Sequence, residues 1–185
     1  MLKAMDIFLI IILLKIIPLK ETTIMKRFVR DQGAFSDIIV KLKEKFESLS
    51  HIFPSEILVL IDTGFEIKPP KAKKGEEEPS EEAMDKWKDK KSKAWKFQIK
   101  TIPQMYQDAL DTPKQFVMIG RQSLLDELSE EQVLAFIYNE LRKINSEYKL
   151  QKPDVNTFSD LIKIFGRPDW DKAYNIPNLL EESEE

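Results

Sequence analysis

One stretch of the sequence carries every signal of a helix that buries one face. Its apolar residues recur at helical spacing: Val133, Ile137, Leu141, Ile144 and Tyr148. Ser129 with Gln132 three residues later is a capping-box pattern. Glu130 and Glu131 lie in the first turn, where negative charge interacts favourably with the helix dipole. The pattern predicts a helix over about residues 130–147, and its apolar stripe requires a second layer to pack against.

Three short segments have the patterns of β-strands. Residues 56–62 form an apolar run between Pro54 and Gly64, which is typical of a buried strand. Residues 95–102 alternate apolar and polar side chains, as a half-buried strand does, and residues 114–120 form a third run that ends at glycine. The strands alternate with helical patterns along the chain. We therefore expect an α+β fold in which a small mixed sheet of about three or more strands packs against helices.

Two further helices are expected, one before the three strands and one between the second and the third. One face of the first carries six apolar residues: Phe35, Ile38, Ile39, Leu42, Phe46 and Leu49. This helix begins near Ala34, and Ser36 is placed to cap it. Pro103 opens a second, short helix or turn before the third strand.

The composition suits one globular domain, which we place at residues 34–172. The chain has 185 residues, of which 42% are hydrophobic and 33% are charged. Residues 68–93 form a charged insertion, an acidic block between two lysine blocks, with a helical part near residues 81–91. A nucleic-acid-binding lysine patch is the alternative, but the acidic block and the scarcity of aromatic residues give no specific nucleic-acid signal. Residues 173–185 are expected to form an acidic tail.

Residues 1–25 form an apolar N-terminal extension whose role the sequence leaves open. Its apolar run, residues 7–19, contains Lys15 and Pro18 and is shorter than the ~20 residues that a membrane span needs. A secretory signal, a packing helix or strand, and an extension outside the working protein, with Met25 as its start, are the alternatives. Membrane attachment through residues 7–19 is thus open but not favoured, and a cytoplasmic location is expected.

The scarcity of two residue types excludes several classes of site. The chain has no cysteine and one histidine, His51. Disulfides, thiolate nucleophiles and zinc sites with two or three imidazole ligands within one chain are therefore excluded. His51 itself is expected to be an ordinary loop histidine. The net charge of -3 gives no general attraction to nucleic acid or to an anionic membrane, so a partner must be recognised locally.

Two segments together carry a resemblance to a known family. The segments "SEEQVLAFIYNELRKI" and "KPDVNTFSDLIKIFGRPDW", with the order of strands and the lysine-rich insertion, resemble the phage metallopeptidase family, a zincin-like group of phages and mobile elements. The likeness covers roughly Ala34 to Trp170. It implies a zincin-like fold and a zinc ion held by the histidines of an H-E-x-x-H helix and by a third histidine further along.

The ligand positions of that family are occupied by other residues in this chain. Glu140 matches the glutamate that activates water, which makes it a vestigial general base here. Asn139 and Lys143, four residues apart on one flank of the helix, stand at the two helix histidines, and Pro153 stands at the third. Downstream, Asp154, Val155 and Phe158 do match the family. The resemblance therefore implies a degenerate member that lacks the metal ligands.

Zinc fits these residues poorly. An ammonium at about 4 Å and an effective dielectric of about 20 repels a unit charge by roughly 4 kcal/mol, and a dication by about 8. Deprotonating Lys143 instead, by moving its pKa from about 10.4 to about 7, costs about 4.6 kcal/mol. No cofactor is therefore predicted, although the family implies zinc. We expect Lys143 to pair with Glu140, three residues earlier, in place of the ion.

Two function classes follow from the sequence. The first is a catalytically inactive, metallopeptidase-like binding or structural module with an unknown protein or peptide partner. The second is an active zinc-dependent peptidase that uses Glu140 as general base with unconventional metal ligation, or with a metal shared across an oligomer interface. The other matching residues have structural roles: Asp154 as a helix cap, Phe158 and Leu161 in a core stripe that ends at Gly166, and Trp170 in the core.

Overall fold

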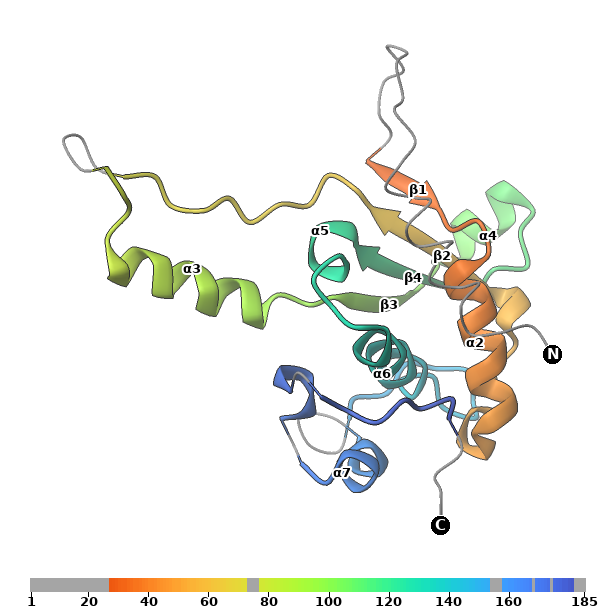
Figure 1. The fold of residues 1–185 in the computed structure, drawn as a ribbon. Coiled ribbons are helices and arrows are strands. Elements are labelled where there is room, and N and C mark those ends of the chain that lie inside the picture. Colours follow the sequence, from red (N-terminus) through yellow and green to blue (C-terminus); the bar gives the residue numbers. More distant parts are fainter. Residues whose placement is uncertain (1–26, 73–76, 154–157, 168, 174, 182–185) are drawn as a thin grey trace.

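A four-stranded mixed sheet forms one layer of the structure (Figure 1). The computed structural model describes residues 27–72, 77–153, 158–167, 169–173 and 175–181. In chain order the strands are β1 (Phe28–Arg30), β2 (Ile57–Asp62), β3 (Phe97–Thr101) and β4 (Phe116–Arg121). Their order across the sheet is β1-β2-β4-β3, with β2 and β4 parallel at the centre and an antiparallel strand on each edge. Three of these strands were predicted, and β1 is additional.

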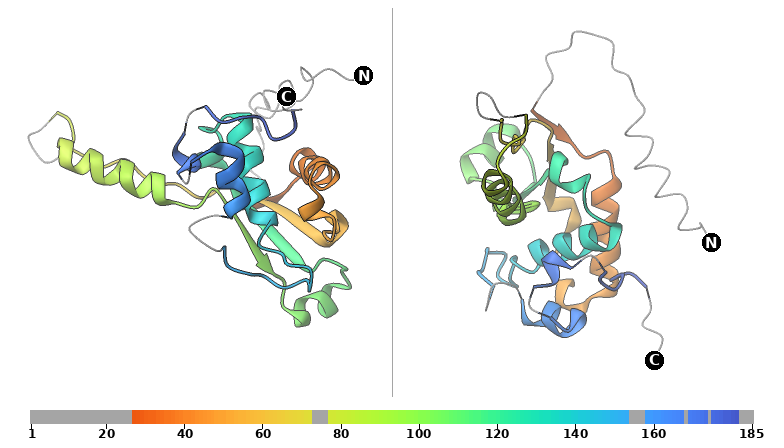
Figure 2. Two further views of the ribbon diagram at one scale, coloured as in Figure 1. Left: turned by 90° about the horizontal axis from the view of Figure 1, so that it is seen from below. Right: turned by 60° about the vertical axis from the view of Figure 1, so that its left-hand side comes forward.

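Six α-helices accompany the sheet in the described residues, which confirms the α+β fold class. They are α2 (Ala34–Lys45), α3 (Glu81–Lys93), α4 (Gln104–Leu110), α5 (Gln122–Leu125), α6 (Glu130–Leu141) and α7 (Ser159–Phe165). Three short 3-10 turns, Glu47–Leu49, Pro54–Glu56 and Trp170–Lys172, complete the helical elements. Helices α2 and α6 lie together below the sheet, and α7 lies on the far side of α6 (Figures 1 and 2).

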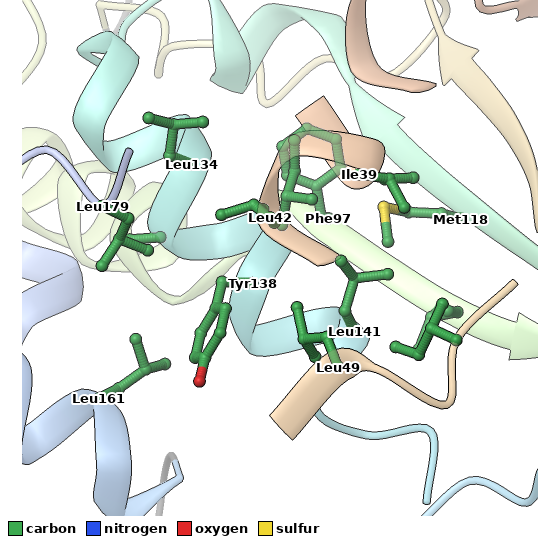
Figure 3. Packing of buried hydrophobic residues seen from close by; sticks show 14 of the residues in the cluster. Ile39, Leu42, Leu49, Phe97, Met118, Leu134, Tyr138, Leu141, Leu161 and Leu179 are labelled. Carbon is green, nitrogen blue, oxygen red and sulfur yellow. The ribbon is translucent and has the colours of Figure 1, made fainter. Parts of the chain in front are cut away.

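Buried and half-buried side chains alternate along the strands, and the buried ones form the core between the sheet and the helices. In β4, Phe116, Met118 and Gly120 are buried, whereas the residues between them are half-buried. The buried set of β4 faces α2 and α6 together with Ile57 and Val59 of β2 and Phe97 and Ile99 of β3. Figure 3 shows this packing, with Leu42 of α2 and Leu141 of α6 among the side chains that fill the interior.

The core continues on the other side of α6. Leu161 of α7 and Trp170 are buried, as expected for the core stripe and for the tryptophan. Gly166 ends α7 in the left-handed conformation that favours glycine. Ile176 and Leu179 are also buried in the same cluster, so the packed chain extends beyond the boundary at residue 172 expected from the sequence.

Two local predictions about helix ends were wrong. Helix α6 ends at Leu141 rather than near residue 147, and Tyr148 lies outside the helix with a positive φ of 60°. Ser36 does not cap α2, because Gly33 is at the N-cap and the Asp31 carboxylate accepts the Ser36 N–H at 2.9 Å. Asp31 thus satisfies helix-start N–H groups from outside the helix. The expected cap Asp154 lies outside the described residues.

The charged insertion projects away from the other elements as an arm (Figures 1 and 2). We define the arm as residues 65–72 and 77–93, which include all of α3. Helix α3 buries no residue, and the Trp87 indole anchors it by donating to the Ile67 carbonyl at 2.8 Å. Within the described chain, no helix is long and apolar enough to cross a membrane. Residues 7–19, considered above for membrane attachment, lie outside that part.

Candidate functional site

Glu140 occupies the last turn of α6, beside the outer edge of the sheet. Its side chain is buried, with the residue 5% exposed. The N–H of Ile99 in β3 donates to Glu140 Oε2 at 2.8 Å. This N–H points away from β4. In an antiparallel pair only every second residue hydrogen-bonds to the partner strand. Here the even-numbered residues do so, as in the bond of 2.7 Å from Ile102 N to Gln115 O, and Ile99 is odd-numbered. The carboxylate therefore satisfies a donor at the edge of β3 that β4 does not reach.

The other oxygen of Glu140 is engaged by Lys143. The Lys143 ammonium contacts Oε1, which confirms the ion pair expected from the sequence. Burial raises the pKa of Glu140 above its ordinary value, and the Lys143 charge together with the Ile99 N–H partly offsets that rise. Both oxygens of this carboxylate thus have a partner, one on the chain that follows α6 and one on β3.

The early end of α6 determines how Lys143 reaches Glu140. After Leu141 the hydrogen bonds shorten to three residues: Lys143 N donates to Glu140 O at 3.2 Å, and Ile144 N donates to Leu141 O at 2.9 Å. Position 143 therefore lies outside α6, and a regular helical turn does not place it directly over position 139.

The chain after α6 is held by its own contacts. Ile144 and Leu150 form an isolated antiparallel bridge, and Gln151 N donates to Lys143 O at 2.7 Å. The partly buried His51 places Nε2 2.8 Å from the Ile144 carbonyl. His51 thus takes part in a structural contact of the loop, consistent with the ordinary role expected for it.

The remaining ligand positions offer little to a metal ion. Asn139 is half-buried on α6 and engaged in an interaction of its own, and the half-buried Pro153 has no side-chain donor atom. No group of three or more His, Cys, Asp or Glu residues within the described residues is placed to hold a metal ion. The donor set at positions 139, 143 and 153 therefore does not fit the zinc ion that the family implies.

A polar cluster that the sequence analysis did not single out lies on the opposite flank of α6. The Tyr138 hydroxyl donates to Asp160 Oδ2 at 2.9 Å, and Arg142 Nε donates to the same oxygen at 2.8 Å. Ser48 Oγ lies 3.1 Å from the Tyr138 hydroxyl. Burial raises the pKa of Tyr138 to about 12, so the phenol keeps its proton at neutral pH. The cluster joins α6 to α7 through an acid near the start of α7.

Glu140 thus lies on α6 of an α+β domain, at the edge of its mixed sheet. The family model described as "Putative phage metallopeptidase" matches residues 26–178. The chain belongs to this family, as the resemblance in its sequence indicated. The chain matches no curated protein and no solved structure at a significant level.

Proposed function

We propose that this chain is a catalytically inactive member of its family, in which the metallopeptidase-like domain serves as a structural or binding module for a protein or peptide partner. The observation that carries the proposal is the state of Glu140. A general base needs a carboxylate oxygen within hydrogen-bond reach of the water that it activates. Here Oε2 accepts the Ile99 N–H, and Oε1 contacts the Lys143 ammonium.

The cost of freeing Glu140 supports the proposal. Turning the carboxylate toward a substrate would leave the Ile99 N–H without its acceptor and would separate a charge pair that is largely shielded from water. Each lost hydrogen bond to a buried charged group costs about 1.5–3 kcal/mol. The carboxylate is therefore held as a connection between α6 and β3.

The donor set supports the same conclusion. Asn139, Lys143 and Pro153 stand where the family places three imidazoles, and an ammonium beside a dication is repulsive by several kcal/mol. Glu140 is then a vestigial general base with no metal-bound water beside it, and the role of the domain lies in what its surface binds.

Zinc binding to the purified, tag-free protein tests the proposal. We expect no stoichiometric zinc by mass spectrometry after incubation with excess zinc and removal of the free ion. A variant with all three imidazoles restored, Asn139→His, Lys143→His and Pro153→His, shows whether this backbone can still hold the ion. Stoichiometric zinc in the unmodified protein that is lost in Lys143→Ala would overturn the proposal and favour the zinc-dependent peptidase.

A peptidase assay completes the test. The unmodified protein and Glu140→Gln are compared on a denatured, labelled protein substrate with and without added zinc. We expect equal and negligible cleavage from both. Cleavage by the unmodified protein that Glu140→Gln abolishes would contradict the proposal directly.

A further inference from the structure

A cleft lies where the arm leaves the sheet. Its volume is about 510 Å³, within the range of small-molecule sites. Its apolar lining residues are Phe65, Ile67 and Ala94, which follows α3, and Arg121 at the end of β4 also lines it. The cleft therefore combines apolar walls with one guanidinium group.

Arg121 is held in place by two aromatic rings. Its guanidinium carbon lies 3.4 Å from the centroid of the Trp95 ring and 3.6 Å from the centroid of the Phe65 ring. Rings at these distances cover the planar guanidinium and attract its positive charge. The group can then donate hydrogen bonds only along its edge, in its own plane.

That edge has almost no partner in the described residues. Arg121 Nε is buried without a hydrogen-bond partner, and Nη1 makes one long contact, 3.5 Å, to the Trp95 carbonyl. The charge of Asp62 reaches Arg121, but the Asp62 carboxylate is already occupied. It accepts two hydrogen bonds of 3.0 Å from Arg27 and one of 3.1 Å from the Gly64 N–H. Within the described residues, Arg121 thus has no carboxylate hydrogen-bonded to it.

The charges around the cleft favour a ligand with a single negative charge. Asp89 in the lining is neutralised by Lys93, whose ammonium lies 2.7 Å from Asp89 Oδ2. Glu66 and Lys90, also in the lining, are opposite in sign, which leaves the charge of Arg121 in excess. The planar fork of a guanidinium matches a carboxylate, whose single negative charge equals this excess.

We propose that this cleft binds the carboxylate of a ligand with an apolar body, with Arg121 as the counter-ion and with Phe65, Ile67 and Ala94 as the apolar contacts. A free small carboxylic acid and the C-terminal carboxylate of a peptide share this chemistry. The inference concerns a site separate from Glu140 and does not depend on the catalytic state of the domain.

The test compares an acid with its amide on the full-length protein. N-acetylphenylalanine carries a carboxylate and an aromatic body, and N-acetylphenylalaninamide differs only in that the carboxylate is replaced by a neutral amide. Binding is followed through the indole N–H signal of Trp95 in proton–nitrogen NMR spectra. We expect the acid to shift this signal saturably and the amide to bind at least about tenfold more weakly, since a charge-assisted pair is lost. Equal shifts from both compounds, or none from the acid, would overturn the proposal.

Variants and a second pair of probes sharpen the result. Arg121→Gln should weaken binding of the acid by about tenfold or more, whereas Lys88→Gln, which removes an exposed cation of the arm outside the cleft lining, should leave it unchanged. A tripeptide that ends in phenylalanine and has a free C-terminus, compared with N-acetylphenylalanine, separates the peptide source from the small acid. Inorganic phosphate that binds as tightly as the acid would overturn the assignment of a carboxylate. If Arg121→Gln fails to fold, the comparison of acid and amide on the unmodified protein still tests the proposal.

Discussion

The Lys143 ammonium contacts Glu140 Oε1 from a position just beyond the end of α6. The same carboxylate accepts the Ile99 N–H through Oε2, so one buried side chain connects the end of a helix to the edge of a sheet. We therefore expect the Glu140 carboxylate to contribute to the stability of the fold.

Replacing Lys143 with methionine should make stability depend on pH. Without the ammonium, the pKa of Glu140, already raised by burial, rises further. The folded protein then binds a proton more tightly than the unfolded chain does, so stability is fully present below pH 4.5 and is lost as pH rises through the higher folded pKa. We expect Lys143→Met to cost about 1.5–3 kcal/mol at pH 7, the size of a hydrogen bond to a charged group, and little at pH 4.5. Urea unfolding at both pH values measures the difference.

The double variant Glu140→Gln with Lys143→Met is the matched control. Glutamine has no charge to lose, and its amide oxygen can still accept the Ile99 N–H. At pH 7 the double variant should be more stable than Lys143→Met alone, and its loss should not vary with pH. A loss for Lys143→Met that is the same at both pH values would show that the Glu140 carboxylate does not depend on the ammonium.

Asp160 should contribute more to the free energy of unfolding than most partly exposed acids do. Asp160→Ala removes the acceptor of both the Tyr138 hydroxyl and Arg142 Nε, and Tyr138 is only 1% exposed. The Tyr138 hydroxyl keeps Ser48 Oγ as a neighbour, but hydrogen bonds to a charged carboxylate are lost, and such a bond contributes about 1.5–3 kcal/mol. Urea unfolding of Asp160→Ala should show a loss of that size. Asp171→Ala, an acid in the nearby Trp170–Lys172 turn, is the control, and an equal loss there would contradict the specific role of Asp160.

Much of the fold was predictable because its signals are local. Alternating side chains located β3, and the apolar run after Pro54 located β2. The capping box predicted the start of α6, where Ser129 Oγ accepts the Gln132 N–H and Gln132 returns a bond to the Ser129 N–H. Such patterns depend on neighbours within a few residues, and one sequence contains them in full.

The features that the sequence did not predict depend on distant parts of the chain. Strand β1 has three exposed residues, and only its pairing with β2 makes it a strand. The apolar stripe continued to Tyr148, but Ile144 instead bridges to Leu150 and Tyr148 accepts the Phe53 N–H at 2.8 Å. Ile144 and Tyr148 belong to a loop that packs on the core. Apolar residues at helical spacing look the same in such a loop as in a longer helix, so the spacing alone does not distinguish the two.

The candidate site was predicted in part for the same reason. The pair of Lys143 with Glu140 is local and was expected from the spacing, whereas the bond from Ile99 joins residues 41 positions apart. The role of Asp160 depends on α7 lying against α6, which no local pattern reveals. The stacking of Arg121 between Phe65 and Trp95 likewise requires the sheet and the arm to meet.

The cap of α6 supports a third prediction. Ser129→Ala should cost about 1 kcal/mol, because the N–H of Gln132 loses its acceptor at the start of the helix. Gln132→Ala should cost more, since Gln132 Nε2 also donates to the buried Ala173 carbonyl at 2.7 Å and so connects α6 to the segment after the last 3-10 turn. Thermal unfolding of the two variants ranks these losses, and a larger loss for Ser129→Ala would contradict this account of Gln132.

Gly120 packs closely against its surroundings, and its replacement gives the last prediction. A Cβ at this position would lie 2.9 Å from Phe97 Cε1 and 2.9 Å from Leu125 Cδ1, closer than van der Waals contact allows. Phe97 is the cross-strand partner of Gly120. The side chains of Phe97 and Leu125 are both buried, so neither can move into solvent to make room for the new methyl group. Gly120→Ala should therefore destabilise the protein by about 1–3 kcal/mol in urea unfolding. Gly64→Ala, whose Cβ would meet only the exposed Arg27 side chain, should change stability by less than about 0.5 kcal/mol. Equal losses of stability at the two glycines would contradict the prediction, because they would mean that a methyl group at position 120 meets no special crowding.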